Sequence, residues 1–145
     1  MRIAVGSDHR GLVLKKRVIE LLEKAGQTCL DMGAYTEDRV DYPVIAKKVA
    51  QAVANGQFER GVLICGTGIG MSMAANKVKG IRAAMVFNEF TACRARQHND
   101  ANIICLGAEN DQTQLPQIID AFLTCKFEGG HHQHRVDMMR EMENT

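Results

Sequence analysis

Val62-Leu63-Ile64-Cys65-Gly66-Thr67-Gly68-Ile69-Gly70 is the run of residues on which the expected architecture rests. Its apolar start predicts a buried strand that ends at Cys65, and the alternate glycines predict a close turn. Residues 71–77 then predict a helix. The free N–H groups at a helix start point into one small space, and the helix dipole adds partial positive charge there. The turn is therefore a candidate anion site with a thiol at its edge.

Other interpretations of this run stay open at this point. A free cysteine is more often a packing residue than a reactive one, and glycines alone serve tight turns. The run is not a Walker loop, because no Gly-Lys-Ser/Thr follows it. It also does not complete the dinucleotide fingerprint, because Met71 occupies the third glycine position. The role of the thiol therefore depends on which residues from elsewhere in the chain lie beside it.

The composition excludes several classes of protein. The chain has 145 residues, of which 46% are hydrophobic and 24% charged, and these values fit one globular domain. A formal net charge of +1 offers no general attraction for nucleic acid or for an anionic membrane. The five cysteines lie mostly in apolar runs, so neither a disulfide framework nor a zinc ribbon is expected. A reducing compartment fits best, and without a signal-peptide layout we expect the cytoplasm.

Strand and helix patterns alternate five times with short connections. This alternation predicts an α/β fold, a single domain with a parallel sheet and helices on both faces. The expected strands are 3–5, 28–32, 62–65, 81–87 and 103–106, the fourth apolar enough to be covered on both faces. The expected helices are 14–25, 43–53, 71–77, 89–98 and 115–123. If the first and third strands are neighbours, the loop Ser7-Asp8-His9 meets the glycine turn at their carboxyl ends.

Residues 127–145 form a C-terminal arm after the break at Gly129-Gly130. Val136, Met139 and Met142 mark one possible helical face. Two interpretations stay open, a solvated terminal helix and an arm that crosses a dimer interface.

Histidines supply the candidate partners of the thiol. Cys65 suits a nucleophile or a general base, and His98 either moves protons on a ligand or meets the dipole at its helix end. Adjacent imidazoles cannot easily face one ion, and no nearby cysteine or paired carboxylate completes a set, so no metal is expected at His131, His132 and His134. With Arg135 they form a candidate anion patch. Together these groups suit proton transfer beside a carbonyl, through an enediolate.

Seven motifs carry a resemblance to a known family: Gly6-Ser7-Asp8-His9, Asp41-Tyr42-Pro43, Ile64 to Gly70, Ala74-Ala75-Asn76-Lys77, Gly80-Ile81-Arg82-Ala83, Arg96-Gln97-His98-Asn99-Asp100 and Glu128-Gly129-Gly130. In this order the chain resembles the type B ribose-5-phosphate isomerases, whose relatives include galactose-6-phosphate isomerase subunits. The resemblance implies a Rossmann-like three-layer α/β/α fold with five parallel strands. It also implies a homodimer or a dimer of dimers, no metal and no organic cofactor.

The resemblance also implies roles for individual residues. Cys65 is the base that shuttles a proton between C1 and C2, with Thr67 near the reacting carbons, and His98 helps to open the furanose ring from the partner subunit. The anion hole is formed by Gly66, Thr67, Gly68, Ile69 and Gly70. Sugar hydroxyls are contacted by Asp8 and Asn99, and the phosphate by His9, Arg135 and the position of His131. Asp8 and His9 also have local interpretations, as a helix cap and a loop contact.

Two positions depart from this family. Glu109 and His131 stand where its members carry arginines that help to hold phosphate. A carboxylate near a phosphate dianion costs about 1 kcal/mol at exposed separations. The expected reaction interconverts ribose 5-phosphate and ribulose 5-phosphate, and allose 6-phosphate, galactose 6-phosphate or an unphosphorylated aldose are alternative substrates. A nonenzymatic phosphate- or nucleotide-binding module and a dinucleotide-dependent oxidoreductase are the competing functions.

Overall fold

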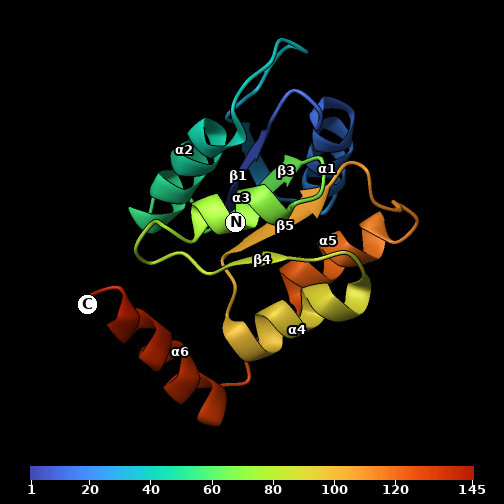
Figure 1. Ribbon diagram of the computed structural model, residues 1–145. Helices are drawn as coiled ribbons and strands as arrows, with labels where there is room; N and C mark the ends of the chain where they lie inside the picture. Colours follow the sequence, from blue (N-terminus) through green and yellow to red (C-terminus); the bar gives the residue numbers. More distant parts are fainter.

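The computed structural model describes residues 1–145, which form a five-stranded parallel sheet and six helices (Figure 1). The strands lie in the order β2-β1-β3-β5-β4. Their bounds are β1 Arg2–Ser7, β2 Thr28–Asp31, β3 Arg60–Cys65, β4 Ala83–Met85 and β5 Ile103–Gly107. The helices are α1 Leu12–Lys24, α2 Tyr42–Ala54, α3 Ile69–Ala75, α4 Glu89–Asn99, α5 Leu115–Thr124 and α6 His131–Met142. The predicted alternation and the all-parallel sheet are confirmed.

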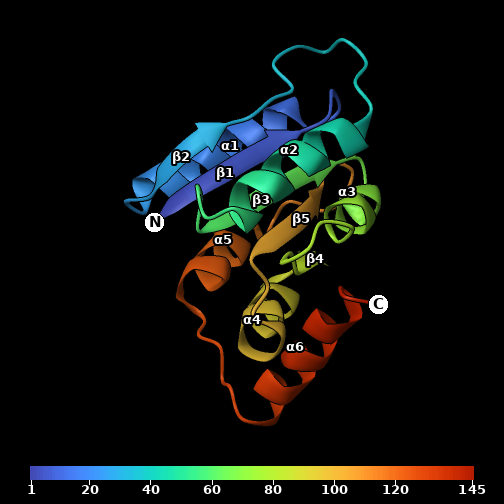
Figure 2. The same cartoon turned by 90° about the vertical axis from the view of Figure 1, so that its left-hand side faces the viewer.

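Helices cover both faces of the sheet and make three layers, as predicted (Figure 2). On one face, α1, α4 and α5 bury side chains such as Val18, Ala92 and Phe122 against β1, β3 and β5. On the other face, α2 and α3 do the same through Val49 and Met71. Strands covered on both sides carry apolar residues throughout, which is why β3 and β5 read as continuous hydrophobic runs in the sequence.

The fourth strand differs from the prediction. Only Ala83–Met85 pair as β4, and they form an edge of the sheet with partly exposed side chains. Phe87, expected to be buried at the end of this strand, is 53% exposed. The expectation of a long strand covered on both faces is therefore wrong, because an apolar run does not reveal whether its strand lies at the centre or the edge of a sheet.

Cysteine pairing also departs from the sequence analysis. Cys93 on α4 and Cys125 at the end of α5 form a disulfide with a Cα–Cα distance of 5.5 Å. The expectation of unpaired cysteines is wrong for these two, while Cys29, Cys65 and Cys105 are free. None of the helices is long and apolar enough to cross a membrane.

The arm, residues 127–145, lies outside the three layers (Figures 1 and 2). Its helix α6 sits beside α4, and Val136 is its one buried residue. The Gly80 N–H donates to Glu143 at 2.9 Å and ties the far end of the arm to the loop before β4. Met138, Met139 and Met142 remain 47%, 39% and 68% exposed, so most of the predicted methionine face is uncovered within this chain.

Candidate active site

The strand order reverses between β1 and β3, because β2 lies outside β1 while β5 and β4 follow on the far side of β3. In such sheets, ligands bind beyond the carboxyl ends of the strands at this reversal. The two strands are neighbours, as the sequence analysis required, and the Asp8 N–H donates to the Ile64 carbonyl at 3.1 Å. The loop after β1 therefore lies directly beside the glycine turn, Gly66–Gly70.

The glycine turn brings an N–H group onto the thiol. Gly68 has φ +82°, a left-handed conformation that glycine adopts without strain. In this conformation its N–H donates to the Sγ of Cys65 at 3.2 Å. Cys65 is only 5% exposed, so this donor meets the sulfur away from bulk water, where it stabilises negative charge on it most strongly. The predicted closeness of thiol and turn is confirmed.

The helix after the turn begins at Ile69, two residues earlier than predicted, and is seven residues long. The Ile69 N–H donates to Thr67 Oγ1 at 3.2 Å, so the threonine side chain supports the helix start. A Cβ on Gly70 would lie 2.6 Å from the ring of Tyr42, and only glycine allows α2 to approach so closely. The tyrosine of the Asp41-Tyr42-Pro43 motif thus packs on the back of the turn.

Asp8 and His9 lie in the loop after β1, beside the end of β3. Asp8 is 5% exposed, and its Oδ1 accepts from the Arg10 N–H at 2.9 Å. It does not cap α1, whose N-cap is Gly11 without a side-chain bond, so that interpretation is wrong. The Nδ1 of His9 accepts from the Val40 N–H at 3.3 Å, which leaves its Nε2 free for a ligand. Both residues line a cavity of about 550 Å³, together with Arg10, Arg39 and Tyr42.

An ion pair crosses the mouth of the site. Arg10, after β1, contacts Glu109, after β5, and both side chains are about half exposed. A Cβ added to Gly66 would lie 2.9 Å from Arg10 Nη1, so the guanidinium rests on the glycine turn. The sequence analysis placed Glu109 near the site but did not identify Arg10. The sequence does show Arg10 two residues after Asp8 in the same loop, and this position could have identified it.

The remaining free thiols differ from Cys65 in their surroundings. Burial raises the pKa of Cys105 far above its ordinary value, and the nearby Cys65 adds to this. Burial also raises the pKa of Cys29 to about 11, with a further contribution from Glu23. Neither thiol receives an N–H from the glycine turn. Cys65 is the free cysteine that the fold equips for chemistry.

His98 and Asn99 lie near the amino end of β5, away from the carboxyl ends of the strands. They are the last residues of α4, a few residues before β5 begins at Ile103. Cys65 pairs with Gly107, at the end of β5. At about 3.3 Å per residue, the length of β5 alone separates the two groups by about 13 Å. The structure therefore brings Asp8, His9, Cys65 and the glycine turn together, but places His98 and Asn99 elsewhere in the same chain.

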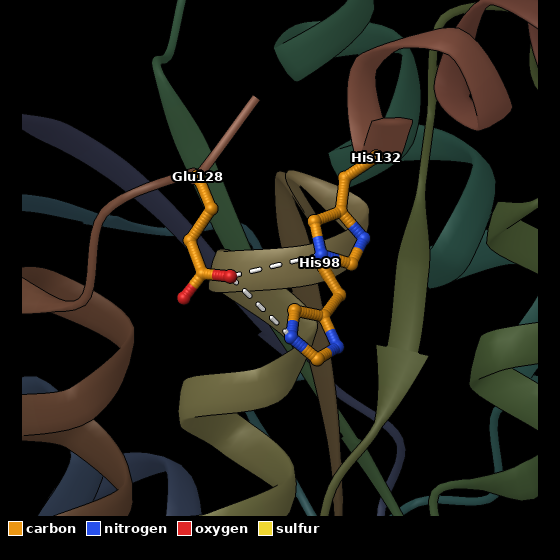
Figure 3. Close-up of side chains that lie close together, drawn as sticks. All are labelled: His98, Glu128 and His132. Carbon is orange, nitrogen blue, oxygen red and sulfur yellow. Dashed lines mark ion pairs between the residues drawn. The ribbon is translucent and has the colours of Figure 1, made fainter. Parts of the chain in front are cut away.

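Three side chains from separate elements meet at this second location (Figure 3). His98 Nε2 and His132 Nε2 each lie 3.6 Å from Glu128 Oε1. The two imidazoles stack, with ring centroids 4.1 Å apart. Partial burial lowers the pKa of His132, and the neighbouring His131 and His98 lower it further. We call His98, Glu128 and His132 the imidazole–carboxylate cluster.

Only part of this cluster was predicted from the sequence. His98 and the histidines at 131, 132 and 134 were singled out, but Glu128 was not joined to them, although Glu128 stands four residues before His132. The C-cap of α4 is Asp100, so His98 is free to turn its ring toward the arm. His131 stacks beside His132 at a centroid distance of 4.0 Å, and Arg135 is exposed on the next turn of α6.

Known proteins resemble this chain along nearly its whole length. Ribose-5-phosphate isomerase B of Escherichia coli (strain K12) is 43% identical over 143 residues, which are 98% of this chain and 96% of that protein. The solved ribose-5-phosphate isomerase B of Clostridium thermocellum superposes with a TM-score of 0.96 at 45% identity, covering 99% of this chain and 98% of that one. The Mycoplasma genitalium enzyme, solved with bound ribulose-5-phosphate, superposes with a TM-score of 0.93 at 44% identity, covering 99% and 96%.

The match extends from the first strand into the arm. The family model described as Ribose/Galactose Isomerase covers residues 3–139, which include the loop after β1, the glycine turn and the imidazole–carboxylate cluster. The resemblance drawn from the motifs is thereby confirmed at the level of the family. With Cys65 beneath its glycine turn at the reversal of the strand order, this chain belongs to the Ribose/Galactose Isomerase family.

Proposed function

We propose that this chain interconverts ribose 5-phosphate and ribulose 5-phosphate. One observation carries the proposal. The buried thiol of Cys65 accepts a hydrogen bond from an N–H of the glycine turn, at the carboxyl end of β3 where the strand order reverses. A relative of this fold at 44% identity has been solved with ribulose-5-phosphate bound, which supports the choice of substrate. A module that only bound phosphate would have no use for a thiol at this point.

Cys65 acts as the base in the proposed mechanism. Its thiolate removes the proton from C2 of the open-chain aldose, and the electron pair of that C–H bond forms the enediolate. The negative oxygen on C1 then lies against N–H groups of the glycine turn, with Thr67 beside the reacting carbons. The proton of the C2 hydroxyl passes to the C1 oxygen, and the thiol returns the carbon-bound proton to C1 as the C2 oxygen becomes a carbonyl. The isomerisation is redox-neutral overall, so it needs no external oxidant or reductant.

We further propose that the working site is shared between two subunits. Opening of the furanose ring needs a proton-moving group, and His98 has that chemistry but lies near the amino end of β5, away from the glycine turn of its own subunit. Met138, Met139 and Met142 of α6 are exposed, as are Phe87 and Phe90 at the start of α4, and we propose that a second copy covers these apolar side chains. In such a homodimer the arm delivers its residues to the partner's glycine turn.

The substrate is held from both sides in this arrangement. His9, through its free Nε2, contacts the phosphate from one subunit, and His131 and Arg135 contact it from the partner's arm. Asp8 and Asn99 accept and donate hydrogen bonds to the sugar hydroxyls. Glu109 pairs with Arg10, so the carboxylate partly neutralises this cation beside the site. We also propose a cytoplasmic location: the Cys93–Cys125 disulfide removes the argument from unpaired cysteines, but similarity to ribose-5-phosphate isomerase B of Escherichia coli supports it.

The first experiment measures turnover by wild-type protein, Cys65→Ala and the control Cys29→Ala, which removes a free thiol away from the site. Substrates are ribose 5-phosphate, allose 6-phosphate, galactose 6-phosphate, free ribose and free allose. Loss of a positioned base costs about 100-fold to 10,000-fold in rate, so Cys65→Ala should lose turnover of ribose 5-phosphate and still bind it. Turnover confined to another sugar would assign the chain to that substrate. Undiminished turnover by Cys65→Ala would refute the mechanism.

A second experiment tests the shared site. Cys65→Ala and His98→Ala are each inactive as homodimers and are mixed under conditions that exchange subunits. In a two-fold dimer, half of the random pairs are hybrids, and each hybrid has one site with both residues intact, so about a quarter of wild-type activity should return. A site built within one subunit would return none. Size-exclusion chromatography with light scattering gives the oligomeric state independently.

A further inference from the structure

The imidazole–carboxylate cluster has the donor set of a metal site. Its three donor atoms come from α4, the segment before α6, and α6 itself, and they all lie within 4.8 Å of one another. Figure 3 shows both imidazoles facing the same carboxylate oxygen. We propose that His98, Glu128 and His132 bind one divalent transition-metal ion, with Zn²⁺ as the representative, and that this ion inhibits the enzyme rather than serving as its cofactor.

The spacing of the donors fits such an ion better than it fits direct contacts. Bonds of about 2.0–2.1 Å to tetrahedral zinc place neighbouring donors about 3.3–3.4 Å apart. The two Nε2–Oε1 distances are 3.6 Å, within a few tenths of an ångström of that donor–donor distance. Hydrogen bonds of this type are shorter, with N–O distances of about 2.7–3.2 Å. Because the rings stack at 11°, each must pivot about its Cβ–Cγ bond to aim at a common ion, and that torsion is soft.

The carboxylate is held in place by the chain around it. The Glu128 N–H donates to the Gln97 carbonyl at 3.0 Å, which fixes the backbone of Glu128 one residue away from His98 along α4. Three residues earlier, the Cys93–Cys125 disulfide fastens the same segment to α4. Two independent links therefore position Glu128 against the helix that carries His98. A site with prepositioned donors loses less entropy on binding than one that must assemble.

The donor chemistry also suits a transition-metal ion. Such an ion binds the unprotonated imidazole. Glu128 supplies the negative charge that offsets the ion. Two imidazoles and one carboxylate suit Zn²⁺ and its neighbours more than Mg²⁺ or Ca²⁺, which prefer oxygen donors. Three protein donors leave one tetrahedral position for water.

The fold removes the objection that the sequence raised against a metal site in the arm. From the sequence, adjacent imidazoles were not expected to face one ion easily, and no nearby cysteine or paired carboxylate completed the set. In the structure only His132 of the arm histidines takes part, and the other donors arrive from α4 and from Glu128. Inhibition, unlike binding, rests on the proposed function: an ion on His98 removes the group assigned to ring opening.

Isothermal titration calorimetry with ZnCl₂ on the metal-free full chain tests the site. We expect one ion per chain for wild type and for Cys65→Ala, which excludes the reactive thiol as the ligand. Loss of even an outer-shell partner costs about 10–100-fold in metal affinity, so His132→Ala and Glu128→Gln should bind at least that much more weakly. His134→Ala, on the same helix but outside the cluster, is the matched control and should bind like wild type. Unchanged binding by His132→Ala, or no binding by wild type, overturns the proposal.

Activity then separates this inference from the function. ZnCl₂ should inhibit turnover of ribose 5-phosphate, and EDTA should restore it, with the inhibition constant rising in Glu128→Gln. Zinc that binds at the cluster without lowering turnover would overturn the inhibitory role. Binding by a protein with no isomerase activity would instead refute the proposed function and leave the metal site standing.

Discussion

Reduction of the Cys93–Cys125 disulfide should destabilise the protein by an amount set by the loop that it closes. The cysteines are 32 residues apart in sequence. Closing a loop of that length in the unfolded chain contributes about 3.7 kcal/mol at 25 °C by the chain-entropy relation. For a domain of 145 residues this corresponds to about 12 °C in melting temperature. The bond links α4 to the end of α5, so its loss also loosens the segment that leads into the arm.

Calorimetric melting with and without dithiothreitol measures this contribution. The double variant Cys93→Ser/Cys125→Ser should melt like the reduced wild type and should not respond to the reductant. Cys29→Ser, which removes a free half-buried thiol, is the control and should keep the full response. The reasoning is refuted if reduction moves the wild-type melting temperature by less than about 2 °C, or if Cys29→Ser abolishes the difference.

Three further outcomes are expected. Gly68→Ala should lower the free energy of unfolding in urea by about 1–3 kcal/mol, because Gly68 has φ +82° and the new Cβ would lie 3.1 Å from the Leu106 carbonyl carbon. Gly26→Ala, at φ +86° with open space around it, measures the backbone part of that loss alone. Glu109→Arg should lower KM for ribose 5-phosphate about fivefold, because it removes about 1 kcal/mol of repulsion from the phosphate; a raised KM would show that Glu109 serves the substrate. Cys29, whose pKa is raised from 9.0 to about 11, should have about 100-fold less thiolate at pH 8 in the folded protein than in urea, and peptide mapping after iodoacetamide should show correspondingly slow alkylation.

Local signals in the sequence were sufficient for most elements. The helix expected over 89–98 is observed at Glu89–Asn99, because a capping box at Asn88 and Thr91 begins it and Asp100, at φ +48°, ends it. Likewise the apolar run, the cysteine and the alternate glycines predicted a strand and a turn with the thiol between them. Each of these features depends on residues close together in the chain, so a single sequence contains the information.

Features that depend on tertiary packing were beyond the sequence. The Cys93–Cys125 bond exists because α4 and α5 pack side by side, which no spacing of cysteines reveals. The exposed β4 edge was mistaken for a central strand for the same reason. The pairing of Arg10 with Glu109 joins residues 99 positions apart, and from the sequence Glu109 was considered only in relation to the substrate phosphate.

Cys65 and His98 lie near opposite ends of the strands, and this separation has a chemical consequence. Ring opening and proton transfer between carbons are separate steps, and each needs its own acid–base group. The proposed base, Cys65, lies at the carboxyl end of β3, and His98 lies near the amino end of β5. Under the proposed mechanism, a lone chain with this geometry cannot bring both groups to one sugar. In the proposed homodimer, the second copy that covers the exposed methionines of α6 would also complete the site. Regulation at the imidazole–carboxylate cluster would act on one half of the chemistry and leave the thiol untouched.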